Sequence, residues 1–149
     1  MKALLQRVSR AAVRVEGDEI ARIGPGLLIL LGVAERDHAG FPERLAARCA
    51  DLRIFEDGQG KMNRSVREVQ GEALVVPQFT LVADTSRGRR PSFDSAAGPE
   101  FAERAFTAFC AALSALAVPT GRGRFGASME VELVNRGPAT FLLEITPET

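Results

Sequence analysis

The sequence predicts an α+β domain in which barrel-like mixed β-sheets are flanked by two main helices. Three patterns support this fold class: alternation of apolar and polar residues near both ends of the chain, an apolar run at residues 27–33, and helical spacing of apolar residues in two segments. The length of 149 residues fits one domain. Because the sequence has no repeats, linkers or low-complexity tracts, we expect a single domain over residues 1–149.

Strands are expected at the beginning of the chain. Residues 4–8 and 13–23 alternate apolar with polar side chains, which is typical of half-buried strands, and turns are expected near Ser9 and near Gly17. Residues 27–33 are apolar at nearly every position, as in a strand covered on both faces. We therefore expect this run to form a central strand.

The rest of the chain completes seven or eight strands and two substantial helices. Pro42 lies near the start of the first helix, and Pro119 and Gly121 end the second. The expected order is a helix over 41–52, a strand over 52–56, a turn over 57–60, an irregular or briefly helical segment over 61–69, a strand over 73–82, a long loop over 84–98, a helix over 99–118, and strands over 129–133 and 141–145.

Composition indicates a soluble protein of the cytoplasm. The 19 basic and 19 acidic side chains cancel, which argues against a protein that coats nucleic acid by bulk electrostatics. Cys49 and Cys110 lie in helical segments and are expected to be buried free thiols, as in a reducing compartment. The longest apolar stretch, residues 27–31, is too short to cross a membrane, so no membrane partner is expected.

Positive charge is nevertheless concentrated in two loops. Arg87, Arg89 and Arg90 fall in one glycine-containing loop, and Arg122 and Arg124 fall in another. The planar guanidinium group binds phosphate well. Two interpretations remain open, a phosphate-binding surface and a set of solvated loop charges.

Several kinds of site are not supported by the sequence. His38 is the only histidine, so a Ser-His-Asp or Cys-His arrangement lacks its usual base unless His38 supplies it. Cysteine, histidine and carboxylate residues show no metal-ligand spacing, and no dinucleotide or Walker-type fingerprint is present. We therefore expect neither a metal nor a cofactor.

The first segment that does suggest chemistry is Pro77-Gln78-Phe79-Thr80-Leu81. As part of a strand, it would place Gln78 and Thr80 on one face and Phe79 and Leu81 on the other. Pro77 has no N–H group and should lie at an edge or a bulge, where the amides of Phe79 and Thr80 could point at a ligand. Free amides of this kind form oxyanion holes. The alternative is that Thr80 is an ordinary strand residue.

The second segment is Asn135-Arg136-Gly137-Pro138-Ala139-Thr140, which lies between two strand-like runs. A strand ladder normally excludes proline. The segment therefore either forms a plain turn or presents backbone carbonyl groups to a ligand. Together with the first segment, it suggests a catalytic cleft.

With these residues in view, the chain resembles the D-aminoacyl-tRNA deacylases from end to end. The matching segments are Gln6-Arg7-Val8, Gly24-Pro25-Gly26-Leu27-Leu28, Leu52-Arg53-Ile54-Phe55-Glu56-Asp57, Lys61-Met62-Asn63, Gln78-Phe79-Thr80-Leu81, Arg89-Arg90-Pro91-Ser92-Phe93 and Asn135-Arg136-Gly137-Pro138-Ala139-Thr140. The resemblance implies hydrolysis of D-aminoacyl-tRNA, and of glycine mischarged on alanine tRNA, by a homodimer with active sites at the subunit interface.

The resemblance also implies roles for individual residues. Main-chain amides of Phe79 and Thr80 would hold the ester carbonyl beside Gln78. The carbonyl groups of Gly137 and Pro138, joined by a cis bond, would come from the partner subunit and reject L-aminoacyl groups by collision. Substrate or tRNA binding is assigned to Arg7, Pro77, Asn135, Arg87, Arg89 and Arg90. Thr80 acts either as a covalent nucleophile or only through its backbone, and the absence of a base favours the second.

One departure from the family pattern is Pro77, where most members have serine. A related branch with a Pro-Gln pair at this position has relaxed chirality toward mischarged L-alanine, although that branch lacks the phenylalanine found here at position 79. The alternatives to a D-selective hydrolase are therefore a relaxed-chirality deacylase of L-alanyl-tRNA, a non-catalytic RNA-binding dimer, and a dimeric scaffold without a ligand.

Overall fold

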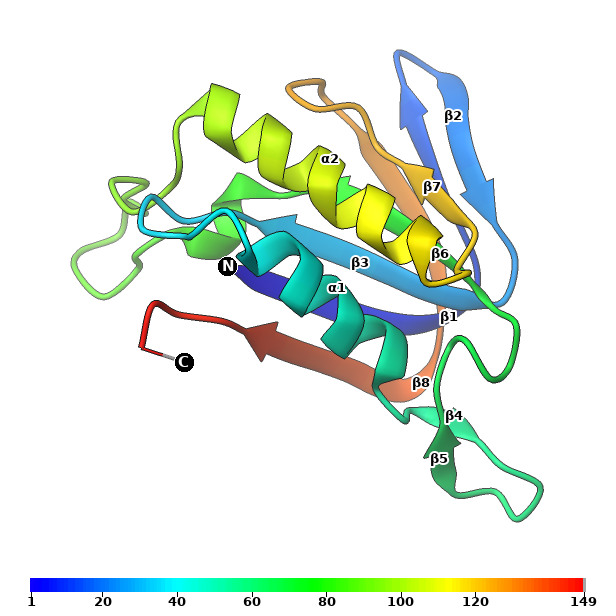
Figure 1. Ribbon diagram of the computed structural model, residues 1–149. Helices are drawn as coiled ribbons and strands as arrows, with labels where there is room; N and C mark the ends of the chain where they lie inside the picture. Colours follow the sequence, from blue (N-terminus) through cyan, green and yellow to red (C-terminus); the bar gives the residue numbers. More distant parts are fainter. Residues whose placement is uncertain (149) are drawn as a thin grey trace.

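A computed structural model describes residues 1–148 and shows one curved mixed sheet with two helices packed on one of its faces (Figure 1). The main sheet has the strand order β2-β1-β3-β6-β7, and β8 pairs with β1 along nearly its whole length, from Lys2 to Arg14. Its strands are β1 (Lys2–Val15), β2 (Asp18–Ile23), β3 (Gly26–Gly32), β6 (Glu72–Pro77), β7 (Thr120–Arg122) and β8 (Glu130–Glu144). The helices are α1 (Phe41–Asp51), α2 (Pro99–Ala115) and the short 3₁₀ helix η1 (Phe79–Val82), and a small hairpin is formed by β4 (Phe55–Glu56) and β5 (Met62–Arg64).

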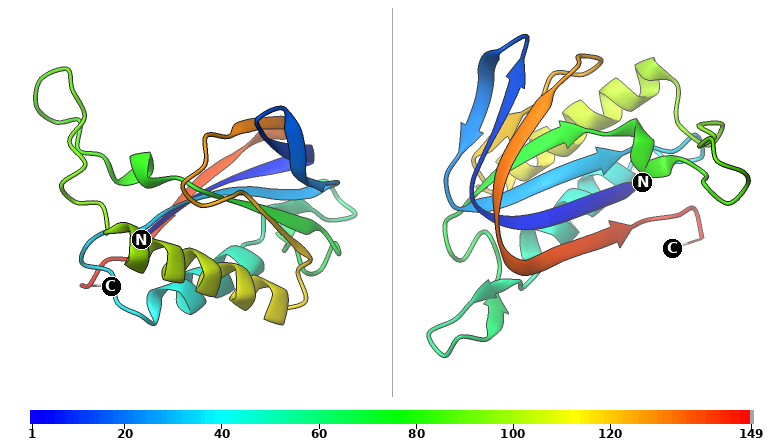
Figure 2. Two further views of the ribbon diagram at one scale, coloured as in Figure 1. Left: turned by 90° about the horizontal axis from the view of Figure 1, so that it is seen from above. Right: turned by 180° about the vertical axis from the view of Figure 1, so that it is seen from behind.

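Two hydrophobic cores hold these layers together. The first lies between the helices and the sheet and includes Leu5, Ile29, Leu45 and Phe109, all fully buried. The second lies on the other face, where the long strands curl over, and includes Leu28. Because alternate residues of β3 enter different cores, β3 is buried on both faces, as its sequence predicts. Figure 2 shows the face of the sheet that neither helix covers.

The α+β fold class, the two helices, the central strand and the turns at Gly17 and at residues 57–60 are confirmed. The sheet is mixed because β6 is parallel to β3 and β7, whereas β1 is antiparallel to its three neighbours. The second helix ends at Ala115, earlier than expected, since Ala117 adopts a left-handed conformation with φ of 64°.

Other expected boundaries are wrong. The chain does not turn at Ser9, and β1 continues to Val15. The alternation of apolar and polar residues breaks there because the pairing of β1 with β8 shifts register. The expected strands at 129–133 and 141–145 are one strand, β8. The strand expected over 52–56 is reduced to β4, and the segment 61–69 contains β5. Arg122 lies in a strand, β7, and not in a loop.

Candidate active site

The first candidate segment lies where β6 ends. The expected strand over 73–82 stops at Pro77, and η1 follows, so the period-two argument that separated Gln78 and Thr80 from Phe79 and Leu81 is wrong. Pro77 lies beyond Val75, the last β6 residue that pairs with β7, so its missing N–H group removes no bond between these strands. The end of β6 is fixed to the central strand, because the amide of Gln78 donates to the carbonyl oxygen of Leu31 at 2.8 Å.

The turn of η1 exposes the groups that the sequence singled out. Phe79 is 58% exposed and Thr80 is also exposed. The first N–H groups of a helical turn have no partner within that turn. Among the residues described, the amides of Phe79 and Thr80 donate to no backbone acceptor outside it either. The side-chain amide of Gln78 donates a hydrogen bond to the hydroxyl of Thr80.

The second candidate segment is a bulge within β8. Thr140 pairs with Gln6 and Asn135 pairs with Val8, so residues 136–139 stand opposite Arg7 alone. The Gly137–Pro138 peptide bond is cis, and both residues are exposed. A Cβ atom at position 137 would clash with Oδ1 of Asn135, so any other residue there would displace the Asn135 side chain.

Two side chains hold the bulge in place. Arg7 is only 6% exposed, and its Nε donates to the carbonyl oxygen of Arg136 at 2.8 Å while a terminal nitrogen donates to that of Ile54 at 2.6 Å. The side-chain amide of Asn135 donates to the carbonyl oxygens of Arg7 and Ala139, both at 3.2 Å. Arg7 and Asn135 therefore position the loop from within the chain, and their direct contact with a substrate stays a prediction.

The two segments do not meet in one chain. Gln78 is bonded to Leu31, which pairs with Ala3, whereas the bulge lies opposite Arg7. Four residues of β1 separate these positions, about 13 Å at a rise of roughly 3.3 Å per residue. In Figure 1, η1 lies near the N-terminal end of β1, and β8 bends at the other end of the sheet. Each segment is thus exposed at a different place.

Family models and known proteins agree on the relationship of this chain. Residues 4–144 match the family model described as D-Tyr-tRNA(Tyr) deacylase. The chain belongs to this deacylase family. It is 56% identical to a D-aminoacyl-tRNA deacylase of Cereibacter sphaeroides (strain KD131), with 97% of this chain and 99% of that protein covered. It is 54% identical to a D-aminoacyl-tRNA deacylase of Deinococcus radiodurans, with 97% and 100% covered.

Solved structures extend the comparison to the deacylase fold. A structure described as c-Myc DNA Unwinding Element Binding Protein has a TM-score of 0.92 and 39% identity, with 98% of this chain and 99% of that chain covered. A structure described as a probable eukaryotic D-amino acid tRNA deacylase has a TM-score of 0.81 at 17% identity, with 97% and 98% covered. The second similarity shows the fold alone.

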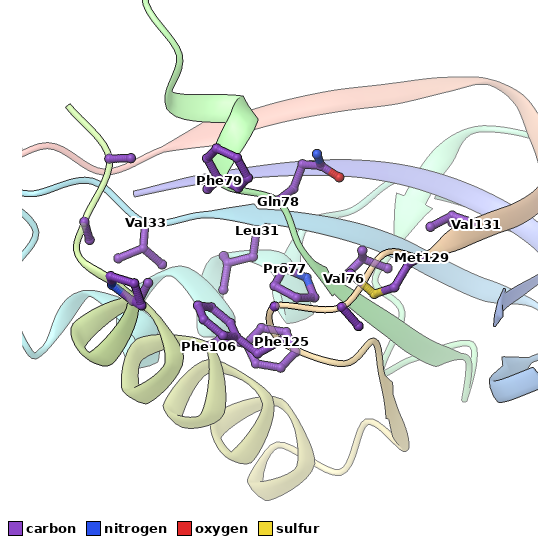
Figure 3. Close-up of a pocket in the computed structure, with 16 residues that line it drawn as sticks. Leu31, Val33, Val76, Pro77, Gln78, Phe79, Phe106, Phe125, Met129 and Val131 are labelled. Carbon is purple, nitrogen blue, oxygen red and sulfur yellow. The ribbon is translucent and has the colours of Figure 1, made fainter. Parts of the chain in front are cut away.

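In this deacylase a cavity of about 540 Å³ opens beside Gln78 and Phe79 (Figure 3). Its lining is mainly apolar. It comes from the ends of β3 and β6, from α2 and the residues just before it, and from the β7–β8 loop with the start of β8. Phe106 and Phe125 lie with ring centroids 6.4 Å apart at one side of it, and Met129 lies nearer β6. Phe106 lies in the helix expected over 99–118, whereas the sequence analysis did not single out Phe125. The signal that could have identified Phe125 as a cavity residue is the presence of a large aromatic side chain among the glycines of residues 121–126.

Conventional catalytic groups lie elsewhere in the deacylase. The ring of His38 packs against Phe41 at the start of α1, with centroids 5.0 Å apart, and does not line the cavity. Within residues 1–148 no cluster of histidine, cysteine and carboxylate side chains could hold a metal ion. No helix in that range is long and apolar enough to span a membrane. Cys49 and Cys110 are buried, and burial raises their pKa values to about 12 and about 11.

Proposed function

We propose that this chain hydrolyses the ester bond of D-aminoacyl-tRNA, releasing the D-amino acid and free tRNA, and that it acts on glycyl-tRNA(Ala) in the same way. Family membership and the names of the relatives support the general activity, a hydrolase acting on aminoacyl-tRNA. The proposal adds that the enzyme is a cytoplasmic homodimer and that each active site is shared by two subunits.

The single observation that carries the shared site is the separation of its two halves. Gly137 and Pro138 are exposed on a bulge about 13 Å along β1 from the Gln78 segment, at roughly 3.3 Å per residue. In a two-fold contact, if one surface of the first copy touches a second surface of its partner, the reverse contact forms as well. A dimer of this kind can bring the bulge of each copy to η1 of the other copy. The site is then complete only in the dimer.

The uncovered face of the sheet offers a surface for this contact. Leu142 on β8 is 55% exposed, and its strand neighbour Leu4 is half-buried. Gln6 and Thr140 are hydrogen-bonded on the same stretch, with 3.2 Å between Nε2 and Oγ1. Apolar residues exposed on a sheet face, with polar residues beside them, are typical of a protein interface.

In the proposed mechanism, backbone amides stabilise the transition state of ester hydrolysis. The amides of Phe79 and Thr80 donate to the ester carbonyl oxygen as it gains negative charge, which is the function of an oxyanion hole. The ribose 2′-hydroxyl of the substrate helps to position or activate the attacking water. Thr80 contributes through its backbone. Among the side chains of residues 1–148, the one bonded to its hydroxyl is the amide of Gln78, whose NH₂ group cannot accept a proton.

Selection against L-aminoacyl groups is assigned to the partner's bulge. The carbonyl groups of Gly137 and Pro138 would occupy the space that an L side chain requires, so an L substrate collides whereas a D residue or glycine fits. Arg7 and Asn135 keep that bulge rigid through their four hydrogen bonds to backbone carbonyl oxygens. The apolar cavity beside Phe79 suits a flat ring of the substrate's terminal nucleotide, which can stack on aromatic side chains.

The test combines substrates and mixed dimers. Purified protein is expected to deacylate D-tyrosyl-tRNA and glycyl-tRNA(Ala) and to leave L-tyrosyl-tRNA intact. One inactive variant altered at Gly137 and another altered at Phe79 are then co-expressed. Their heterodimer contains one intact composite site, so activity should return. Failure of every mixed dimer to regain turnover, with both parents folded and dimeric, would refute the shared site. Intact D-tyrosyl-tRNA and glycyl-tRNA(Ala) after incubation with wild type would refute the function.

A further inference from the structure

A second cavity, of about 360 Å³, lies beside the Gly137 bulge, and we name it the hairpin cavity. Its walls are β4, the segment 69–72, Arg7 of β1 and Arg136 of the bulge. The β4–β5 hairpin extends from the end of the sheet at which β8 bends (Figure 1). Because the hairpin cavity shares no lining residue with the cavity beside Phe79, the two are separate sites.

Arg7 places a buried positive charge at the wall of the hairpin cavity. The residue is only 6% exposed, and no ion pair joins it to a carboxylate within residues 1–148. Two of its N–H groups donate to the backbone carbonyl oxygens of Arg136 and Ile54, and its other N–H groups meet no acceptor in that range. By contrast, the arginines of the loop over 84–98 are exposed to water, namely Arg87, Arg89 and Arg90. A buried guanidinium lacks this solvation, so an anion in the hairpin cavity would offset the cost of burying the charge.

Two carboxylates line the same cavity without neutralising Arg7. Glu56 and Glu72 form no ion pair with any cation among the described residues. One oxygen of Glu72 accepts from the amide of Gly24 at 3.2 Å, and the other has no hydrogen-bond partner in the described part of the chain. The strand β3 separates β6 from β1, so about 10 Å lies between the backbones that carry Glu72 and Arg7, at roughly 4.8 Å per strand. Opposite charges therefore line one cavity and leave a gap between them.

We propose that the hairpin cavity binds a free α-amino acid as a zwitterion. The carboxylate of the amino acid binds the guanidinium groups of Arg7 and Arg136, and its ammonium group donates to Glu56 and Glu72. A guanidinium group matches the two oxygens of a carboxylate, and an ammonium group carries three donors for the acidic side of the cavity. A ligand with a single charge would satisfy one side alone. The binding does not depend on the proposed hydrolysis, although that reaction releases a molecule of the same class.

The test is calorimetric titration of the purified protein with D-alanine. The variant E56Q/E72Q removes both negative charges from the cavity and keeps at position 72 an oxygen that can accept from Gly24. The control E43Q/E103Q removes the same charge from exposed positions on α1 and α2. The cavity variant should bind D-alanine at least about tenfold more weakly than wild type, the value of one hydrogen bond to a charged group, and the control should bind as wild type does.

Two analogues test the two sides of the cavity separately. D-Alaninamide keeps the ammonium group and lacks the carboxylate, whereas propionate keeps the carboxylate and lacks the ammonium group. Each should bind wild type at least about tenfold more weakly than D-alanine does. The absence of D-alanine binding, an equal loss in the control variant, or propionate binding as tight as that of D-alanine would overturn the proposal.

The position of the ligand is tested by nuclear magnetic resonance and by kinetics. D-Alanine should shift the amide signals of Val8 and Gly71, which line the hairpin cavity, and should leave KM for D-tyrosyl-tRNA within about twofold. A rise in KM that persists in E56Q/E72Q would mean that D-alanine competes in the active site, and it would overturn the proposal. A protein that binds D-alanine in this cavity but never hydrolyses the ester would support the cavity and refute the proposed function.

Discussion

Replacing Phe79 by proline tests whether a backbone amide performs the catalysis. Proline removes the N–H group but fits the first position of a helical turn, where that group has no partner inside the turn. Gln78 precedes it with φ of −142° and ψ of 79°, outside the helical region that proline disfavours in the residue before it. The matched control is F79A, which loses the same ring and keeps the amide.

The two variants should differ by the value of one oxyanion donor. Loss of such a donor costs about 10²–10³ in kcat, or roughly 2.7–4 kcal/mol. The side chain of Phe79 is 58% exposed, and F79A removes its packing on Phe93. An aromatic pair contributes about 0.5–1.5 kcal/mol, so F79A should lose no more than about tenfold even if all of that energy is lost in the transition state.

The assay is single-turnover deacylation of D-tyrosyl-tRNA, with circular dichroism and thermal unfolding as checks that both variants fold. F79P should be about 10²–10³-fold slower than F79A, because both variants lack the ring and differ in the backbone donor at position 79. If the two variants have the same rate, the Phe79 amide does not stabilise the oxyanion. If F79A falls by 10² or more, the aromatic ring is what the reaction needs.

Three further outcomes are expected. R7K should lower the melting temperature and the deacylation rate together, because a buried lysine cannot reach both carbonyl oxygens that Arg7 binds. Each hydrogen bond from a charged group contributes about 1.5–3 kcal/mol to stability. An unchanged deacylation rate in a folded protein would contradict the positioning role. L142D should give an inactive folded monomer by light scattering, since Leu142 is exposed in the single chain; an active monomer would exclude the shared site. Cys49 and Cys110 should resist alkylation at pH 8 until the protein unfolds, because their raised pKa values keep the thiols protonated. Both folded pKa values exceed the ordinary thiol pKa of 9.0. The protonated thiols therefore contribute stability that is present below pH 9 and is lost as the pH rises toward 11–12, and thermal unfolding measured against pH will detect this loss.

Periodicity predicted the elements whose burial is uniform along their length. The helix α1 presents Phe41, Leu45 and Cys49 at helical spacing to one core, and β3 is apolar on both faces because two cores enclose it. These signals are local, so a single sequence contains them. The two candidate segments were also found locally, because proline beside strand-like residues is unusual wherever it occurs.

The geometry of the site depended on long-range pairing, which local patterns do not contain. The bulge at Gly137 exists because Gln6 and Val8, more than a hundred residues away in the chain, set the register on both sides of it. The end of β6 at Pro77 depends on its pairing with β3, which continues to Leu31 although the pairing of β6 with β7 stops at Val75. The cavity likewise joins α2 to the loop containing Phe125, segments that are brought together only by the folded sheet.

The position of Pro77 favours a D-selective enzyme over the relaxed-chirality alternative. Its ring lines the cavity, and a Cβ atom at Gly123 would lie 3.2 Å from its Cδ atom and 2.8 Å from the sulfur of Met129. Pro77 thus belongs to the apolar wall of the cavity and not to the Gly137 bulge, which lies opposite Arg7. Since selection is assigned to that bulge, P77S should change the rate on D-tyrosyl-tRNA without opening the site to L-alanyl-tRNA. Hydrolysis of L-alanyl-tRNA by wild type, abolished in P77S, would show instead that the cavity wall sets chirality.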